Sequence, residues 1–395
     1  MAPRKRIVFI HHGRGLGGAP LSLLYLIQGL DKERFEPVVV FLHDSEALKL
    51  FKAHNLTVVG PTNTYDFPHT KIWWLSWRQL PLLARVISDS IKTIIVTAPA
   101  LYTSLKPDIL HLNTSSLIAW AAAAHVKKIP VVWHIREPLA DGYMGLRKRL
   151  VRWCVRTFST VIVPISHHDA QPWNRLPKTH VVYNAVPTHR FDFSITPARI
   201  DHGSQQRILF LGGCSREKGT LQLLITFQEL VKRLPQAHLV IAGALPAAGG
   251  WRVSPGSQFA AQVHRYLQRL APNITLAGVT YDIPALMASC QVVVFPATVG
   301  HFARPIIEAG FMKKPVIASQ LPPLNELVHN GVSGFLVDPY DSEAWAAKLY
   351  TLLTDHALQQ TMGEAGYAWC SQQFGMEKHV HQIATLYDAI LERDV

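Results

Sequence analysis

The sequence predicts an α/β protein made of two Rossmann-like domains. Its 395 residues exceed what one ordinary core uses and suit two domains of roughly 150 to 200 residues each. Hydrophobic residues make up 48% and charged residues 17%, so there is enough apolar surface for two cores. Short runs rich in valine and isoleucine alternate with helical segments in both halves, which is typical of βα units around a parallel sheet.

The first domain is expected at 1–185, with strands at 7–11, 37–42, 109–113, 131–134, 161–164 and 181–183. A second series of strands is expected at 208–211, 239–242, 274–276, 292–295, 316–318 and 335–337, within a domain spanning 207–375. Between them, 186–206 has prolines and no regular hydrophobic period, which indicates a linker. We expect 376–395 to form a helix that packs back on the first domain, and the two domains to face a cleft that binds ligand.

Cysteine use and apolar run lengths indicate the compartment. The four cysteines are far apart in the sequence, which argues against a disulfide framework and against a zinc site. The apolar run behind the first basic residues is too short for a signal peptide. The most apolar stretch, 117–124, is much shorter than the ~20 residues that span a bilayer. We therefore expect a cytoplasmic protein whose membrane contact, on the inner face, is peripheral.

The net charge of +12 comes from the first half of the chain. Residues 1–185 hold 23 Lys and Arg against 11 Asp and Glu, whereas 186–395 hold 16 of each. A one-sided positive field favours an anionic partner such as acidic lipid headgroups or a phosphorylated acceptor. Nucleic acid is not the expected partner, because no zinc-finger spacing, RNP-like motif or basic zipper occurs.

Two segments suit an anionic membrane surface. Residues 71–78 place Trp73, Trp74 and Trp77 between cations, a composition typical of a headgroup interface. A basic helical face is predicted from Arg147, Lys148, Arg149, Arg152 and Arg156. The alternative is that the tryptophans are core residues and the charges are only solvated.

A glycine-rich loop follows the first strand. Residues 13–18 fit G-x-G-x-x-G before a helix predicted at 19–30, so helix amides could face a phosphate. A dinucleotide site also needs an acid after the second strand, and Asp44 lies there at a longer spacing than usual. An NAD-dependent enzyme that uses this loop therefore stays an alternative, as does a tight turn without a ligand.

The second half repeats nucleotide-like features more densely. Residues 212–219 follow a strand and open a helix predicted at 220–234, which places Arg216 and Lys218 beside a helix N-terminus, where cations and helix dipole can meet an anion. Three further segments follow in order, namely 301–310 with Arg304 and Glu308, 325–327 with Glu326, and the glycine-bounded run 331–337.

In this order the segments resemble the donor-binding half of the group 1 glycosyltransferases (family 4), over roughly residues 207 to 340 and in outline over the first half. The resemblance implies a GT-B fold and sugar transfer from a nucleotide-sugar donor, mostly with retention. It implies that Lys218 binds the donor diphosphate, Glu308 the nucleotide ribose, and Gly17 and Gly18 approach the diphosphate. His134, at the end of a first-domain strand, matches the family histidine near the donor sugar.

We therefore take His134, Lys218 and Glu308 as candidate catalytic residues. Candidate nucleotide-binding residues are Gly17, Gly18, Arg216, Lys218, Arg304, Glu308 and Glu326. Gly213 replaces the usual family arginine, and Gly300 replaces the first glutamate of the E-x7-E motif. Arg216 and His301 could take over these roles. If they do not, the chain would be a catalytically silent sugar-nucleotide binding protein.

The expected chemistry follows from the bond that breaks. Cleaving a sugar–phosphate bond leaves charge on a departing diphosphate, so fixed positive groups must stabilise it. No Asp-x-Asp triplet occurs, and we expect neither a metal nor a cofactor besides the nucleotide-sugar donor. The expected product is a saccharide or a lipid-linked sugar in envelope polysaccharide, exopolysaccharide or glycolipid synthesis.

Overall fold

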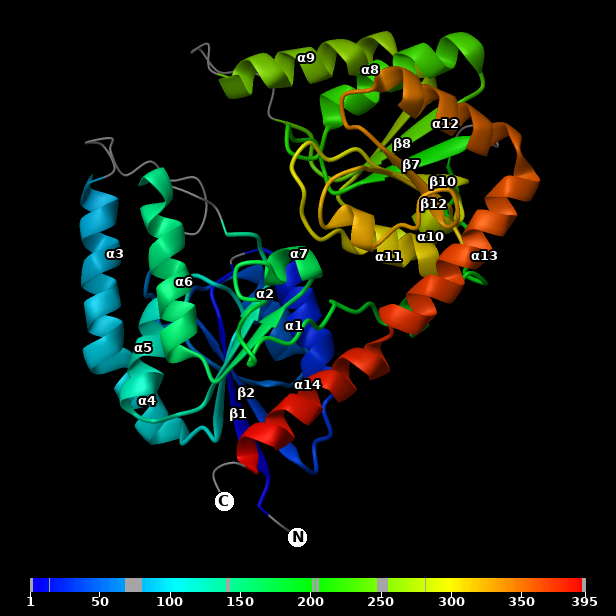
Figure 1. Ribbon diagram of the computed structural model, residues 1–395. Coiled ribbons are helices and arrows are strands. Elements are labelled where there is room, and N and C mark those ends of the chain that lie inside the picture. Colours follow the sequence, from blue (N-terminus) through cyan, green and yellow to red (C-terminus); the bar gives the residue numbers. More distant parts are fainter. Residues whose placement is uncertain are drawn as a thin grey trace. The chain divides into compact units, whose positions relative to one another are not determined.

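The computed structural model describes residues 3–13, 15–67, 80–139, 143–200, 203, 206–246, 255–280 and 282–392. The chain forms two compact units, Met1–Asn184 with Met376–Val395, and Ala185–Gly375. Each unit contains one six-stranded sheet whose strand pairs are all parallel, with helices packed against it (Figure 1). The predicted α/β class with two Rossmann-like sheets is confirmed.

The sheet of the first unit has the order β3-β2-β1-β4-β5-β6. Its strands are β1 (Lys5–His11), β2 (Phe35–Phe41), β3 (Thr57–Val59), β4 (Ile109–Leu112), β5 (Val131–Ile135) and β6 (Val161–Pro164). The chain runs outward from β1 to β3 and then returns to place β4 on the other side of β1. The loops after β1 and β4 therefore diverge at the carboxyl edge, which is where such sheets bind ligands.

Alternate residues of β1 pack on opposite faces of this sheet, as the pleat of a strand requires. Phe9 packs with α1 (Gly18–Gly29), α2 (Glu46–Ala53) and α14 (Met376–Leu391), and α14 lies beside α1 in Figure 1. Ile10 packs in the core on the other face. The helices there are α4 (Ala98–Leu105), α5 (Ile118–Val126) and α6 (Leu146–Phe158), with α3 (Leu80–Lys92) joined to α4 by the π-helical turn η2 (Thr93–Thr97).

Two predictions for this sheet were wrong. Residues 181–183 are not a strand: Val182 donates a backbone hydrogen bond to Pro164 of edge strand β6, and the isolated bridge to this strand lies earlier, between Ile162 and Thr179. Strand β3 was missed, because it has three residues that are only partly buried. A run this short and this exposed carries little hydrophobic signal.

The sheet of the second unit has the order β12-β11-β10-β7-β8-β9. Its strands are β7 (Arg207–Leu211), β8 (His238–Ala242), β9 (Ile274–Gly278), β10 (Val292–Phe295), β11 (Val316–Ser319) and β12 (Gly334–Val337). The order reverses between β7 and β10, so the loops after these two strands lie together at the carboxyl edge. The predicted strands of this half all appear, with ends that differ by at most two residues.

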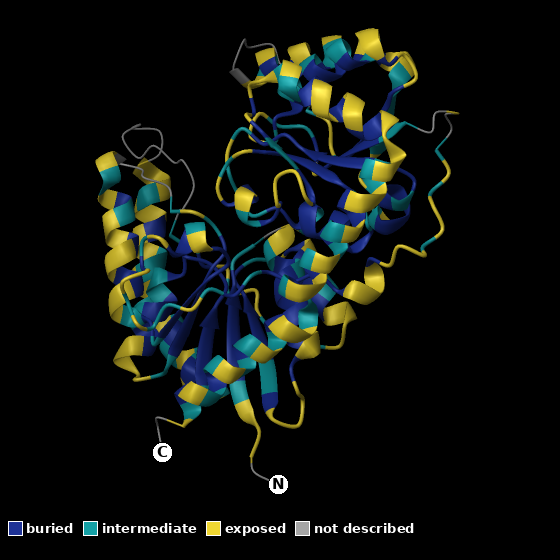
Figure 2. Cartoon of the chain, turned by 45° about the vertical axis from the view of Figure 1, so that its right-hand side comes forward, coloured by how far each residue is buried: buried dark blue, intermediate teal, exposed yellow. Residues whose placement is uncertain are grey.

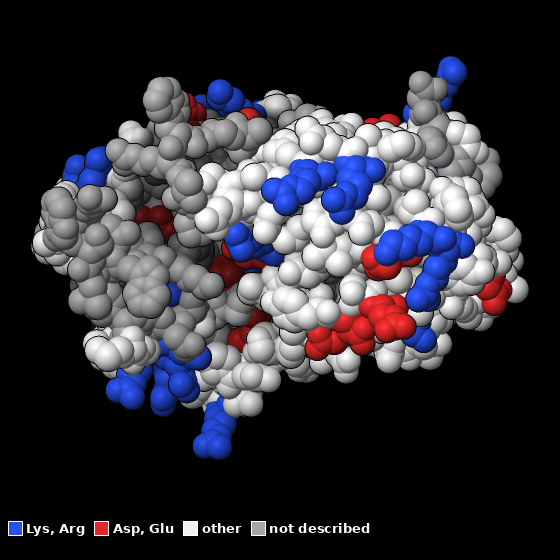
Figure 3. All heavy atoms as spheres, turned by 90° about the horizontal axis from the view of Figure 1, so that it is seen from above, with Lys and Arg blue, Asp and Glu red and all other residues white. Residues whose placement is uncertain are grey.

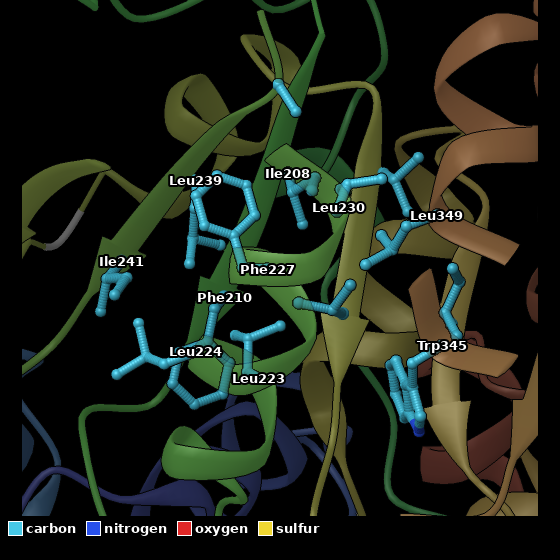
Figure 4. Close-up of a cluster of buried hydrophobic side chains, with 14 of the residues drawn as sticks. Ile208, Phe210, Leu223, Leu224, Phe227, Leu230, Leu239, Ile241, Trp345 and Leu349 are labelled. Carbon is cyan, nitrogen blue, oxygen red and sulfur yellow. The ribbon is translucent and has the colours of Figure 1, made fainter. Parts of the chain in front are cut away.

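Helices α8 (Thr220–Arg233), α9 (Pro255–Arg269) and α12 (Ser342–Thr354) pack on one face of the second sheet. Figure 4 shows the core they close, where Phe210 and Leu239 of the sheet meet Phe227 of α8 and Trp345 of α12. Burying each such side chain contributes about 2 kcal/mol. The remaining helices of this unit are α10 (Ile283–Ala288), α11 (Arg304–Phe311) and α13 (His356–Gln373).

The central strands of both sheets are buried, whereas the helices carry much of the exposed surface (Figure 2). In the described parts of the chain, no helix has both the length and the apolar character needed to cross a bilayer.

Candidate functional site

The two loops at the reversal point of the second sheet are hydrogen-bonded to each other. Thr298, after β10, donates its backbone N–H to the carbonyl of Glu217, after β7, at 3.0 Å. Its hydroxyl donates to the carbonyl of Arg216 at 2.8 Å. The loop that carries Lys218 is therefore held in place by the loop after β10.

Gly219 makes this arrangement possible. It has φ +71°, and a Cβ at this position would lie 1.6 Å from the carbonyl oxygen of Pro296. Only glycine tolerates both the left-handed backbone and this close approach. The glycine of the Lys-Gly pair thus lets Lys218 sit directly before α8, against the end of β10.

The ammonium of Lys218 is held by His301. The Lys218 Nζ lies 3.0 Å from His301 Nε2 and 5.3 Å from the ring centroid of Phe295. His301 Nδ1 lies 2.9 Å from the carbonyl oxygen of Val299, which can only accept, so Nδ1 carries the proton and Nε2 accepts from Lys218. Burial lowers the pKa of both groups, and the Lys218 charge lowers the pKa of His301 further. Two of the three ammonium N–H groups remain available to an anion.

Glu308 is a buried carboxylate on the wall of a cavity of about 230 Å³. Arg304, one turn earlier on α11, donates from Nη2 to Glu308 Oε1 at 3.0 Å. Burial raises the pKa of Glu308, although the charges of Arg304 and Arg190 oppose the rise. The cavity is otherwise lined by Leu211, Gly212, Ala242, Gly243, Val279, Thr280, Ile283 and Pro305, at the carboxyl ends of β7 and β8 and the start of α10 and α11.

Lys218 and Glu308 flank the same glycine. Gly212 lines the cavity with Glu308, and a Cβ built on Gly212 would lie 3.5 Å from Lys218 Nζ. The loops after β7 and β8 approach closely here, since a Cβ on Gly243 would lie 2.3 Å from the backbone nitrogen of Gly213. The structure therefore places Lys218, which does not itself line the cavity, beside Gly212, which lines it together with Glu308.

The other predicted residues of this unit lie around that centre. The Arg216 guanidinium lies over the ring of Phe259 in α9, 5.1 Å from its centroid. Glu326 lies in the short 3-10 turn η6 (Leu324–Glu326), half-buried, and is not among the residues that line the cavity. Arg304 is tied to the cavity wall by its hydrogen bond to Glu308.

Both glycine departures from the family pattern have a backbone cause. Gly213 has φ +78°, and its Cβ would lie 3.1 Å from the carbonyl oxygen of Ala244. A Cβ on Gly300 would lie 1.9 Å from the carbonyl oxygen of Pro322. The local backbone therefore excludes a side chain at 300 and strains one at 213. His301, the next residue, holds Lys218 instead.

The first-unit candidates lie at the carboxyl edge of the other sheet. Gly17 is the N-cap of α1; among the described residues no side chain caps this helix, and a Cβ on Gly17 would have no described atom within 4 Å. Gly18 is the first residue of α1. His134 is a fully buried residue of β5, whose pKa is lowered by burial and by the charge of Arg136. Its contact to His111 carried no sequence signal, whereas Arg136 lies two residues further along the chain.

The predicted membrane-facing residues are only partly present. Residues 71–78, with their tryptophans, lie outside the described residues. On α6, Arg149, Arg152 and Arg156 are exposed, whereas Arg147 is buried and does not belong to the basic face. Figure 3 presents one face of the molecule, on which Lys and Arg side chains lie in separate groups with Asp and Glu side chains among them.

Two Rossmann-like units, each with one parallel six-stranded sheet, define a GT-B fold. Residues 196–369 match the family model described as glycosyl transferases group 1, and residues 16–190 match that of glycosyltransferase family 4. The chain belongs to the group 1 glycosyl transferases, and the resemblance seen in its sequence is confirmed.

Individual relatives are distant. The alpha-D-kanosaminyltransferase of Streptomyces kanamyceticus is 24% identical over 46% of this chain and 45% of its own length. The capsular polysaccharide biosynthesis glycosyltransferase CapM of Staphylococcus aureus is 25% identical over 46% of each chain. The chain thus spans about half the length of the curated relatives it matches. The structure of Anabaena HepE in complex with UDP and glucose is similar over 98% of this chain and all of that one, with a TM-score of 0.76 and 23% identity, which shows the shared fold.

Proposed function

We propose that this protein transfers a sugar from a nucleotide-diphosphate sugar to a saccharide or lipid-linked acceptor, with retention and without a metal. Its product would belong to envelope polysaccharide, exopolysaccharide or glycolipid synthesis. The observation that carries the proposal is the meeting of Lys218 and Glu308 at Gly212, beside one cavity.

The two side chains suit opposite parts of a nucleoside diphosphate. A carboxylate accepts hydrogen bonds from the two hydroxyls of a ribose, and Glu308 lies in the cavity wall where a nucleoside would enter. An ammonium beside a helix N-terminus stabilises a departing diphosphate. Lys218 has two N–H groups to offer after its bond to His301. This charge takes the place that a metal held by an Asp-x-Asp pair would fill.

The names of similar proteins support a nucleotide-sugar donor and a polysaccharide product. Anabaena HepE was crystallised with UDP and glucose, and with UDP-glucose. CapM is named for capsular polysaccharide biosynthesis. Membership of a glycosyl transferase family also favours this proposal over an NAD-dependent enzyme that uses residues 13–18.

Helix α6 supports an acceptor at an anionic membrane surface. Leu146, Leu150 and Trp153 are 56%, 43% and 57% exposed, at helical spacings that put them on one stripe. Arg149 and Arg156 lie in the same stripe, and with Arg152 they line a cavity of about 620 Å³ beside Trp153. Exposed leucine and tryptophan interleaved with arginine match the headgroup region of an acidic bilayer. We propose that this stripe brings the protein to its acceptor.

A binding panel tests the donor site. Thermal shift with UDP, GDP, ADP and NAD should show stabilisation by one nucleoside diphosphate and none by NAD, because a ligand that binds the folded state raises Tm. Glu308→Gln keeps the size of the side chain and should abolish most of that shift. Stabilisation by NAD alone, or an unchanged diphosphate shift in Glu308→Gln, would contradict the proposed site.

A second candidate function is a sugar-nucleotide binding protein without transferase activity. It is favoured by Gly300, where the backbone leaves no space for the family's first glutamate. Release of nucleoside diphosphate from a panel of nucleotide sugars, with and without saccharide acceptors, distinguishes the two. Tight donor binding with no release under any condition would favour the binding protein.

A further inference from the structure

A buried chain of hydrogen bonds joins the last helix of the first unit to His134. The Tyr387 hydroxyl of α14 lies 2.6 Å from His111 Nδ1, and His111 Nε2 lies 3.2 Å from His134 Nδ1. All three side chains are fully buried. Tyr387 is 276 residues from His111, so only the folded first unit brings them together.

The position of each proton in this chain follows from Arg136. Its Nη2 lies 3.4 Å from His134 Nδ1, and a guanidinium only donates, so His134 Nδ1 carries a lone pair. His111 must then donate to that lone pair from Nε2–H. A neutral His111 therefore accepts at Nδ1, and Tyr387 donates its O–H to it. Each group has one role, and the proton of His134 is left on Nε2.

The surroundings keep the imidazoles neutral. Arg136 is held by the side-chain oxygens of Asn113, at 2.6 Å, and Asn184. Burial first and then the Arg136 charge lower the pKa of His111 and of His134. Burial and Arg136 also lower the pKa of His379, the neighbouring histidine of α14, to about 4. Burial raises the pKa of Tyr387 well above its usual range.

The same cation orients a second histidine. Because Arg136 donates to the Asn113 oxygen, the Asn113 amide nitrogen faces His11 Nδ1, at 3.0 Å, and donates to it. His11 therefore also carries its proton on Nε2. The Nε2 atoms of His11 and His134 are both buried and have no hydrogen-bond partner among the described residues. A buried N–H without a partner is costly, and a ligand oxygen would satisfy it.

We infer that Arg136, and Tyr387 acting through His111, are positioning residues that hold His134 as a neutral imidazole with its proton on Nε2. His134 is then a hydrogen-bond donor and not a base. The identity of the oxygen it meets, a hydroxyl of the donor sugar, rests on the proposed function. The tautomer itself does not, and it is fixed before any ligand binds.

The tautomer can be measured directly in the full chain without ligand. Long-range ¹H–¹⁵N spectra of the ¹⁵N-histidine-labelled protein distinguish Nε2–H, Nδ1–H and charged imidazoles, and the His134→Gln variant identifies the His134 signals by their loss. We expect one Nε2–H species for His134 at neutral pH. An Nδ1–H or a charged His134 would overturn the inference without any further variant.

Tyr387→Phe tests the link from α14. It keeps the ring and removes the donor, so His111 should lose its single tautomer; His134 Nδ1 is then held by Arg136 alone, and the His134 signals should shift. Turnover, followed as UDP release from UDP-glucose, should fall about tenfold in kcat/KM with UDP affinity unchanged. Tyr102→Phe is the matched control, since Tyr102 is a buried tyrosine of the same unit that donates to the Trp120 carbonyl at 2.9 Å. It should leave the His134 signals unchanged.

The outcomes separate the two proposals. Identical His134 spectra in Tyr387→Phe and the unmodified protein would overturn the positioning role. If the spectra change as expected but UDP-glucose does not shift the His134 Nε2–H signal, the tautomer inference stands and the donor-sugar role of His134 fails.

Discussion

Replacing Lys218 by methionine should weaken nucleoside diphosphate binding by about two orders of magnitude. Methionine keeps the length of the side chain and its packing against Phe295, but it removes the two N–H groups that His301 leaves available. Hydrogen bonds to charged groups contribute about 1.5 kcal/mol or more each, so losing two costs about 3 kcal/mol. At about 1.4 kcal/mol per tenfold change in Kd, this is about a hundredfold.

Isothermal titration with UDP and with UMP measures the effect. UMP lacks the second phosphate, so its Kd should change much less than that of UDP, whereas a general distortion of the cavity would weaken both equally. Lys232→Met is the control, because Lys232 is an exposed lysine of α8 that pairs with Glu229. A UDP Kd within about threefold of the unmodified protein, in a variant with an unchanged melting temperature, would refute the assignment of Lys218 to the diphosphate.

Three further predictions concern other parts of the molecule. Gly300→Glu restores the family's carboxylate but should lower Tm without raising turnover, because its Cβ would meet a backbone carbonyl at 1.9 Å. Gly15→Ala, whose Cβ would have no described atom within 4 Å, should leave Tm unchanged, and a more active Gly300→Glu would contradict the geometry. The pKa of His379 is about 4 in the folded state, against an ordinary value of 6.5. Its contribution to stability is therefore complete above pH 6.5 and is lost as the pH falls toward 4. The free energy of unfolding falls by about 3 kcal/mol, so the urea midpoint should be lower at pH 4.5 than at pH 7. The difference should be smaller in His379→Gln, and equal pH slopes for both proteins would be inconsistent with this. Sedimentation with acidic vesicles should fall about fivefold for each of Arg149→Gln and Arg156→Gln, and equal, negligible binding of the unmodified protein to acidic and neutral vesicles would remove the membrane proposal.

The sequence predicted the strands best where burial on both faces leaves a continuous apolar run. Strands β6 and β10 have the predicted bounds, because valine-rich segments between polar turns have no other stable environment. The prediction from sequence failed for two short segments beside the strands of the first sheet. Residues 181–183 are apolar enough for a strand but make single hydrogen bonds to β6, and β3 is too exposed to be seen.

For the site, local motifs predicted single residues but not their partners. The Lys-Gly pair and Glu308 could be read from short segments, and Gly212 lies beside Lys218 and lines the cavity with Glu308. The bond from Lys218 to His301 joins residues 83 apart, so only the β7–β10 neighbourhood creates it. The stacking of Arg216 on Phe259 has the same origin. These contacts depend on tertiary packing, and no spacing in the sequence encodes them.

The return of α14 to the first unit sets the order in which the chain can fold on the ribosome. Ile383, Tyr387 and Ile390 fill the core beside β1 and α1, and they are synthesised after residues 185–375. The first half of the chain therefore emerges without part of its own interior, while residues 185–375 are complete earlier. The first unit therefore completes its fold after the second, and its unfilled apolar face has to stay soluble until α14 has been synthesised.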